Sequence, residues 1–342
     1  MQEHDLADLG IWRLPIPIPF PQAGGPVNVY LLAERGGGVA LFDAGLGTEE
    51  AEATLAEGFR ALGRKFSEVR RIYVSHGHID HFGAARTIQR WHGGELPVFA
   101  HPADFGKLLG RGGARWGPQL GAYGAHLRRL GVPPEALAAI AGEGQKNRRM
   151  AHTLDAVEAV GEGDRLELAH TSLEILHMPG HTPGVLCLYD RAHRILFSDD
   201  HLLERVSPNP LIELGPDGQD GYWRPLVAYE ASIRRARELE VDLVLPGHAE
   251  PFGGHRQIID GLLGFYERRQ RKLQAALEAG PRTAYELVQA LFARARPLDV
   301  FLMVSEVVGN LEVLEGRGLV WRELADDVYR FRNAASGRAR ES

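Results

Sequence analysis

The chain has 342 residues, of which 44% are hydrophobic and 25% are charged, and its formal net charge is -6. This composition is that of an ordinary globular protein and excludes a disordered or fibrous chain, while the length allows about two domains. The acidic balance excludes a nucleic-acid-binding surface over the whole chain, so any such site would be local. The acidic N-terminus and the lack of an apolar run of membrane-spanning length predict a cytoplasmic protein.

Alternating strand and helix patterns run through most of the chain up to residue 255. In the first half, strands are predicted at 11–18, 27–32, 39–42, 71–74 and 98–100, and helices at 48–62 and 81–91. In the second half, a helix is predicted at 223–239 and strands at 165–168, 173–178, 185–190, 194–197 and 243–245. Cys187, the only cysteine, lies in an apolar strand, which predicts a buried thiol and a reducing compartment. Interleaved strands and helices predict an α/β layered domain.

Residues 103–151 interrupt this alternation with helix-like pieces broken by Gly and Pro. We interpret them as a helical insertion. Tyr123 and His126 in this segment, together with Arg115 and Trp116, would suit a lid over a cleft or a packed helical hairpin equally well.

A separate C-terminal module is predicted beyond residue 255. A linking helix covers 256–280, Gly280-Pro281 marks a boundary, and two helices at 283–292 and 300–314 precede short strands at 319–323 and 327–332. This is the order of a winged helix-turn-helix. We therefore expect a catalytic domain over 1–255 and a small winged-helix-like domain over 281–342, whose nearly balanced charge argues against reading DNA.

Residues 76–81 read His-Gly-His-Ile-Asp-His and directly follow a predicted strand. Imidazole and carboxylate are the ligands expected of zinc and similar divalent ions. The strand end sends His76 and His78 to one side, and the turn into a helix can aim Asp80 and His81 at a neighbouring point. The pattern therefore suits two adjacent metal ions better than one.

Three further signals each end an apolar strand downstream: His181, the run Asp199-Asp200-His201, and His248. Functional groups in open α/β sheets collect at the carboxyl ends of strands, so these side chains are expected to converge on one cleft.

With these motifs in this order over residues 10–255, the sequence resembles the metallo-β-lactamase superfamily, whose signature is HxHxDH followed by separate His, Asp and His positions. The resemblance implies a four-layered αββα sandwich with a dinuclear metal centre at one edge of two facing sheets. It also implies a first metal held by His76, His78 and His181, a second held by Asp80, His81 and His248, and Asp200 as the bridge between them.

Such ligands imply a hydrolase with two divalent ions, zinc in the first place and iron or manganese as alternatives. The expected nucleophile is a metal-bridging hydroxide, which Asp80 would orient or whose proton it would receive. The expected substrate is a small ester, thioester, lactone or phosphodiester. Asp200 as a bridge, with Cys187 inside a strand, argues against a true β-lactamase.

One departure from the family concerns Asp199, because the residue before the bridging aspartate is commonly Gly. Strand spacing favours Asp200 as the bridge, so Asp199 would point away from the metals or support a ligand from behind. Asp199→Gly is therefore expected to be mild. His201 would either line the cleft or pack in the core.

Two other functions remain open at this point. The first is a single-strand RNA endonuclease with the same metals, because the C-terminal module also resembles, loosely, the winged helix of β-lactamase-like-2 proteins. Such a module could equally cap the site or form a homodimer contact. The second is a mononuclear iron persulfide dioxygenase, a family that retains the HxHxDH string while using two His and one Asp.

Overall fold

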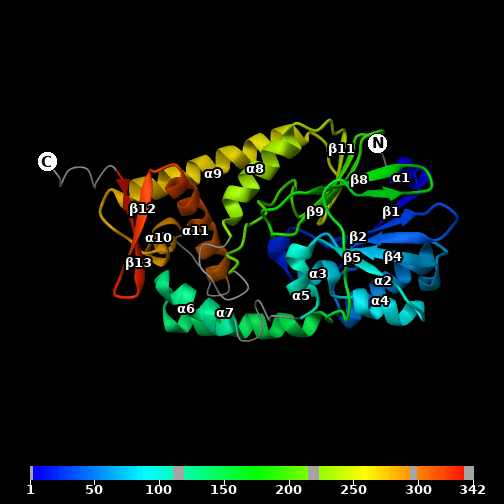
Figure 1. Ribbon diagram of the computed structural model, residues 1–342, viewed down its shortest axis with the longest axis horizontal. Helices are drawn as coiled ribbons and strands as arrows, with labels where there is room; N and C mark the ends of the chain where they lie inside the picture. Colours follow the sequence, from blue (N-terminus) through cyan, green and yellow to red (C-terminus); the bar gives the residue numbers. More distant parts are fainter. Residues whose placement is uncertain (1–2, 111–118, 215–222, 293–298, 335–342) are drawn as a thin grey trace. The chain divides into compact units, whose positions relative to one another are not determined.

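The computed structural model describes residues 3–110, 119–214, 223–292 and 299–334 and consists of two compact units (Figure 1). Unit 1 comprises Met1–Arg111, Asn147–Pro208 and Ser232–Ile259. Unit 2 comprises Gly112–Lys146, Asn209–Ala231 and Asp260–Ser342.

Unit 1 contains two sheets. The first has the order β1-β2-β3-β4-β5-β6 and consists of β1 (Ile11–Ile16), β2 (Val27–Ala33), β3 (Val39–Phe42), β4 (Val69–Tyr73), β5 (Val98–Ala100) and β6 (Glu158–Ala159). The second has the order β11-β10-β9-β8-β7 and consists of β7 (Arg165–Glu167), β8 (Ser172–His177), β9 (Leu186–Asp190), β10 (Ile195–Asp199) and β11 (Leu243–Pro246). Strands β3 to β6 pair in parallel, as do β10 and β11.

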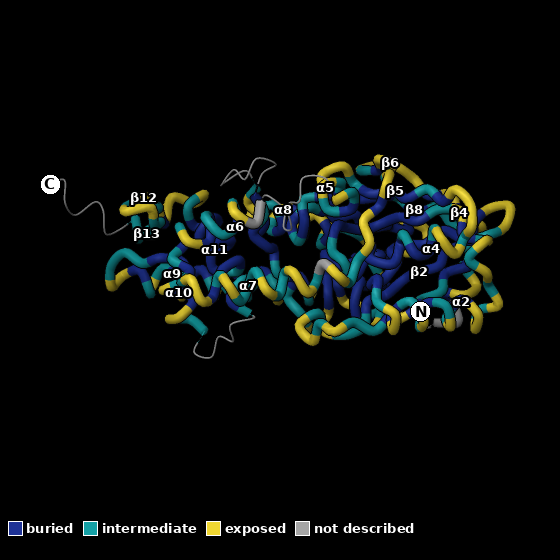
Figure 2. Tube along the Cα trace, turned by 90° about the horizontal axis from the view of Figure 1, so that it is seen from below, coloured by how far each residue is buried: buried dark blue, intermediate teal, exposed yellow. Residues whose placement is uncertain are grey.

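Apolar side chains from both sheets form a shared core between them, and most strands of unit 1 are accordingly buried in Figure 2, whereas the short edge strand β6 is exposed. The ring of Phe197 in β10 meets the rings of Tyr30 and Phe42 edge-on, with centroid distances of 5.2 and 6.2 Å. Edge-on aromatic pairs add to the free energy of area burial. The facing of the two sheets brings the carboxyl ends of β4 and β10 toward the same edge.

Helices cover the outer face of the first sheet (Figure 1). Helix α2 (Glu49–Ala61) begins at Thr48, whose hydroxyl accepts a hydrogen bond from the N–H of Ala51, and its first turn is acidic, as the positive helix N-terminus favours. It buries Leu55 and Phe59, which contribute about 1.5–3 kcal/mol each. Helix α4 (Ala85–His92) packs into the same core. The expected αββα sandwich is confirmed.

Helix α8 (Pro225–Arg237) follows the strands β7 to β10 in the chain, and its C-terminal half belongs to unit 1. Ile233 and Ala236 of α8 are fully buried, and the hydroxyl of Ser232 donates to the carbonyl of Pro179, 2.7 Å away. The shorter elements of unit 1 are α1 (Glu3–Asp8), α3 (Ile79–Phe82), α5 (Phe105–Leu108) and the 3-10 turns Pro21–Ala23, Phe66–Glu68, Pro102–Asp104 and Arg148–Met150.

The predicted helix at 81–91 is wrong in one respect, because it is divided into α3 and α4. A neighbouring loop takes over the backbone hydrogen bonds at the break: Ala44 N–H donates to His81 C=O, and Ala84 N–H donates to Gly45 C=O. A Cβ at Gly83 would lie 2.7 Å from the nitrogen of Gly47, so the two segments approach each other only because Gly83 lacks a side chain. Helix periodicity carries no information about such a contact.

In its described residues, unit 2 is helical apart from loops and one hairpin. It contains α6 (Gln119–Arg129), nearly all of α7 (Pro134–Asn147), most of α9 (His255–Leu277), α10 (Ala284–Leu291), α11 (Val300–Gly316) and the antiparallel pair β12 (Val320–Ala325) and β13 (Val328–Asn333). The order helix, helix, hairpin after residue 283 matches the sequence pattern. A winged helix, and domain boundaries at 255 and 280, stay predictions.

A single core joins the insertion helices of unit 2 to its C-terminal helices. Its buried members include Tyr123 and Leu127 of α6, Leu273 of α9, Leu287 of α10 and Leu311 of α11. The hydroxyl of Tyr123 accepts a hydrogen bond from the N–H of Leu214 at 3.2 Å, so this residue serves the packing of unit 2. Arg115 and Trp116 lie outside the described residues.

Among the described residues, no helix has the length and apolar character that crossing a membrane would require.

We predict that Leu311→Ala lowers the stability of unit 2 by about 2–5 kcal/mol, because it leaves a cavity in a fully buried core. Urea unfolding followed by circular dichroism measures the change. Metal content should not change, since all seven predicted ligands lie in unit 1. Leu188→Ala, in the core between the sheets, is the matched control that should reduce both stability and metal retention. Loss of metal from Leu311→Ala with intact sheets would contradict the independence of the two cores.

Candidate metal centre

The predicted ligands come from four strand ends of unit 1. His76 and His78 lie in the turn after β4, and Asp80 and His81 lie in α3. The other three follow later strands: His181 comes after β8, Asp200 after β10 and His248 after β11. The structure brings all seven into three overlapping groups of candidate ligand atoms, one of which, formed by His76, His81 and Asp200, also includes Asp199.

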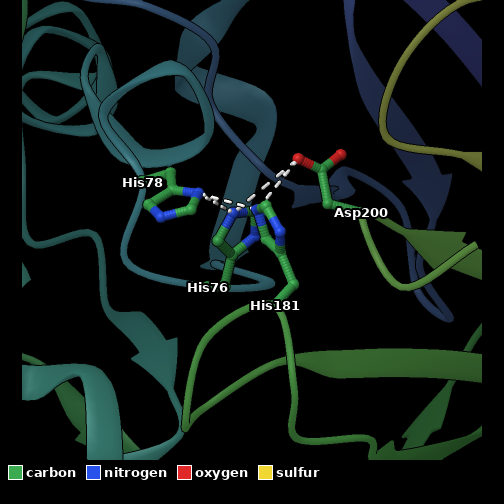
Figure 3. Close-up of side chains that lie close together, drawn as sticks. All are labelled: His76, His78, His181 and Asp200. Atoms are coloured by element: carbon green, nitrogen blue, oxygen red, sulfur yellow. Dashed lines mark hydrogen bonds and ion pairs between the residues drawn. The ribbon is translucent and has the colours of Figure 1, made fainter. Parts of the chain in front are cut away.

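The first group consists of His76, His78, His181 and Asp200 (Figure 3). Nδ1 of His78 lies 2.9 Å from Nε2 of His76 and 2.9 Å from Nε2 of His181. Oδ2 of Asp200 lies 3.4 Å from Nε2 of His181. Three imidazole nitrogens and one carboxylate oxygen therefore face a common point, and this donor set suits a borderline divalent ion.

The second group consists of Asp80, His81 and His248. Nε2 of His248 lies 3.5 Å from Oδ2 of Asp80, and Nε2 of His81 lies 4.0 Å from the same oxygen. Asp200 adjoins this group too, because its Oδ1 is 3.4 Å from Nε2 of His248 and its Oδ2 is 3.5 Å from Nε2 of His81. The carboxylate of Asp200 thus lies between the two groups.

Burial at this centre fits the presence of cations. Asp200 is 6% exposed and His81 is fully buried. Within the described ranges, Nε2 of His81 and Oδ1 of Asp200 are buried and have no hydrogen-bond partner. Buried polar atoms are costly when they lack a partner, and a metal ion held between them would remove that cost.

The electrostatics point the same way. Burial alone would raise the pKa of Asp200, but the imidazoles of His248 and His81 outweigh it and lower that pKa well below its usual range. Burial acts to lower the pKa of His81, yet the carboxylates of Asp199 and Asp200 dominate and raise it well above normal. Burial lowers the pKa of His76, which keeps its ring neutral and able to donate a lone pair. The centre therefore holds ionised carboxylates that attract positive charge.

Asp43 supports the centre from behind, and the sequence analysis missed it. It directly follows β3, has a φ of 67° and is buried. Its Oδ2 lies 2.8 Å from Nδ1 of His81 and accepts a hydrogen bond from the hydroxyl of Ser75 at 2.9 Å, while its Oδ1 accepts from the N–H of Ser75 at 2.7 Å. Its position directly after an apolar strand is the signal that could have revealed it.

Asp104 was also missed, and it links two of the ligand loops. Its Oδ2 accepts hydrogen bonds from the N–H of Gly77 at 2.8 Å and from the hydroxyl of Thr182 at 2.6 Å, while Nζ of Lys107 lies 3.2 Å from its Oδ1. Gly77 stands between His76 and His78, and Thr182 follows His181, so one buried carboxylate holds the neighbours of three candidate ligands. Burial would raise the pKa of Asp104, but Lys107 and these hydrogen bonds lower it. No sequence pattern marks this residue.

The loop that carries His248 is held by the opposite sheet. The N–H of Asn28 donates to the carbonyl of Gly247 at 2.7 Å, and both the side chain of Asn28 and the hydroxyl of Tyr30 donate to the carbonyl of Pro246, at 2.9 and 2.7 Å. Both β2 residues are buried. The position of His248 is therefore fixed by contacts between the two sheets.

His201 is fully buried, and burial lowers its pKa to about 3. It is a neutral side chain of the core beside the centre and does not line a solvent-accessible cleft.

Comparisons with known proteins identify the family of this chain. A family model described as "Metallo-beta-lactamase superfamily" matches residues 23–248. The "Probable metallo-hydrolase YqjP" of Bacillus subtilis is 30% identical over 303 residues, which cover 88% of this chain and 91% of that protein. The "Acyl-coenzyme A thioesterase MBLAC2" of Gallus gallus is 38% identical over 102 residues, which cover 28% of this chain and 32% of that protein.

Solved structures give the same result. A metallo-beta-lactamase family protein from Thermus thermophilus matches with a TM-score of 0.79 and 30% identity over 95% of this chain and 98% of that one. A beta-lactamase domain protein from Burkholderia ambifaria also has a TM-score of 0.79, with 23% identity over 95% of this chain and 92% of its own. At that identity, the second match shows the fold alone.

We predict that Asp104→Asn weakens zinc binding by about 10–100-fold, as loss of a supporting carboxylate behind metal ligands commonly does. An amide cannot accept from Thr182 and Gly77 and still pair with Lys107. Zinc affinity is measured by competition with a chromogenic chelator. Asp155→Asn, which removes an exposed partner of Arg86, is the control and should leave zinc affinity unchanged. Equal affinities for Asp104→Asn and wild type would refute this role.

Proposed function

Because this chain belongs to the metallo-beta-lactamase superfamily and is a metal-dependent hydrolase, we propose that it uses two divalent metal ions to hydrolyse a small acyl compound, with thioesters ahead of esters and lactones. The observation that carries the proposal is the position of Asp200, whose two oxygens face imidazoles of both ligand groups. The similarity to the acyl-coenzyme A thioesterase of Gallus gallus supports this order of substrates.

In this proposal His76, His78 and His181 would hold the first ion, Asp80, His81 and His248 would hold the second, and Asp200 would contribute to both. Two such ions, when bound, lower the pKa of a shared water toward neutrality and polarise the substrate carbonyl. No side-chain nucleophile is then needed.

The other roles in this proposal belong to side chains of the protein. Asp80 is 9% exposed and has its Oδ2 between His81 and His248, from where it can orient the attacking water or receive its proton. Asp43 fixes the ring of His81, and Asp104 fixes the loop that carries His76 and His78 to the loop that carries His181. Rigid support of this kind keeps the reacting groups aligned without reorganisation during the reaction.

We predict that the purified protein binds two transition-metal ions per chain, with zinc as the preferred ion. Elemental analysis after reconstitution gives the stoichiometry. Removal of the metal with a chelator should abolish turnover of short acyl thioesters, and added zinc should restore it. One ion per chain, and iron in particular, would favour the persulfide dioxygenase alternative. Faster turnover of a phosphodiester, together with a salt-sensitive gel shift on single-stranded RNA, would favour the nuclease alternative.

We predict that Asp200→Asn lowers the occupancy of both ions and reduces thioester hydrolysis by orders of magnitude, because a shared carboxylate compensates charge on both sides of the centre. Occupancy and turnover are measured on the same preparation. Asp242→Asn removes another aspartate of unit 1, paired with Arg194 on the surface, and should behave like wild type. Full occupancy of both ions in Asp200→Asn would show that this residue is not the bridge.

A further inference from the structure

Asp199 occupies a backbone position that rarely carries a side chain. It is the last residue of β10, has a φ of 49° and lies where the pairing between β10 and β11 shifts register. The left-handed region favours glycine and admits aspartate or asparagine at a modest cost. This conformation explains how Gly can stand here in the wider family. It does not explain why this chain has a carboxylate at that position.

The carboxylate of Asp199 contacts one imidazole from each ligand group. Its Oδ1 lies 3.0 Å from Nδ1 of His76, and its Oδ2 lies 3.4 Å from Nδ1 of His81. The side chain is 1% exposed, and its Oδ1 also accepts a hydrogen bond from the N–H of Asp200 at 2.6 Å. In both histidines, Nδ1 is the nitrogen opposite the Nε2 that faces the other candidate ligands.

We propose that Asp199 is a positioning residue that supports one ligand of each metal ion from behind. The inference rests on the proposed two-metal function. A carboxylate that accepts the Nδ1 proton fixes the tautomer with a free Nε2, restrains the ring and makes that nitrogen a better donor to a metal. The sequence alone predicts a mild effect of Asp199→Gly, and these contacts lead us to the opposite expectation.

The two ions should not depend on Asp199 equally. His81 keeps a second carboxylate at its Nδ1, because Asp43 lies 2.8 Å from it. Nδ1 of His76 has Ser75 as its other contact, at 3.0 Å, and a hydroxyl carries no charge. Among the described residues, Asp199 is the only carboxylate in contact with Nδ1 of His76, and its loss leaves that nitrogen without one. The ion held by His76, His78 and His181 should be the one that weakens more.

Two substitutions separate this role from a purely structural one. Asp199→Gly removes the carboxylate while relieving the backbone, so it should not lower the stability of the metal-free protein. Asp199→Asn keeps the size and the tolerance of positive φ but removes the charge. The matched control is Asp326→Gly, an exposed aspartate with a φ of 51° between β12 and β13, where only the backbone effect applies.

The test measures stepwise zinc affinities of full-length wild type and variants by chelator competition, together with urea unfolding of the metal-free proteins. Nitrogen-15 NMR of the histidine rings reports the tautomer of His76 in the zinc-bound state. In both Asp199 variants we expect one zinc affinity to fall by about 10–100-fold and the other to fall less. The stability of the metal-free protein should be unchanged in Asp199→Gly. The NMR signal of the His76 ring should be disturbed. Asp326→Gly should match wild type in both zinc affinities and in the His76 ring signal.

Unchanged zinc affinities in both Asp199 variants, with two ions bound by wild type, would overturn this inference and leave the proposed function standing. Equal losses at both ions would overturn the asymmetry between His76 and His81. A wild-type protein that binds one ion would overturn the two-metal function itself, and the two failures are therefore distinguishable.

Discussion

The carboxylate of Asp200 lies among the imidazoles of His181, His81 and His248, which arrive from three different strand ends. A buried carboxylate is costly unless opposite charge compensates it closely, and Coulomb attraction weakens with every ångström of separation. The loops that follow β4, β8, β10 and β11 must therefore place their candidate ligands within a small volume. The remaining features of unit 1 can be understood as ways of meeting that requirement.

Sheet packing supplies the first part of this alignment, since Phe197 presses the end of β10 against Tyr30 and Phe42 of the other sheet. Buried polar side chains supply the rest. Asn28 ties the His248 loop to β2, and Asp104 joins the loops on either side of the first ligand group. Each of these contacts joins segments distant in sequence, so the geometry of the centre is a property of the whole sandwich.

Much of this arrangement could be predicted from the sequence, because apolar strands followed directly by His or Asp are a local pattern. That pattern led to the seven predicted ligands that the structure gathers, and to the α/β sandwich, but it did not mark Asp199 as a member of the group that also contains His76, His81 and Asp200. Asp104 and Asn28 could not be found in this way, since they act through tertiary hydrogen bonds that leave no local trace. The break between α3 and α4 was missed for a similar reason, because the approach of Gly83 to Gly47 is set by folding.

The common core of unit 2 links two stretches of chain that the sequence places in separate regions, the insertion at α6 and α7 and the C-terminal helices α10 and α11. Side chains that share a core are selected together, because a change of volume on one helix must be matched on its neighbours. Homologues of this chain should therefore vary in these two stretches in a correlated way. Chimeras made from them will fold well only when both stretches come from the same parent.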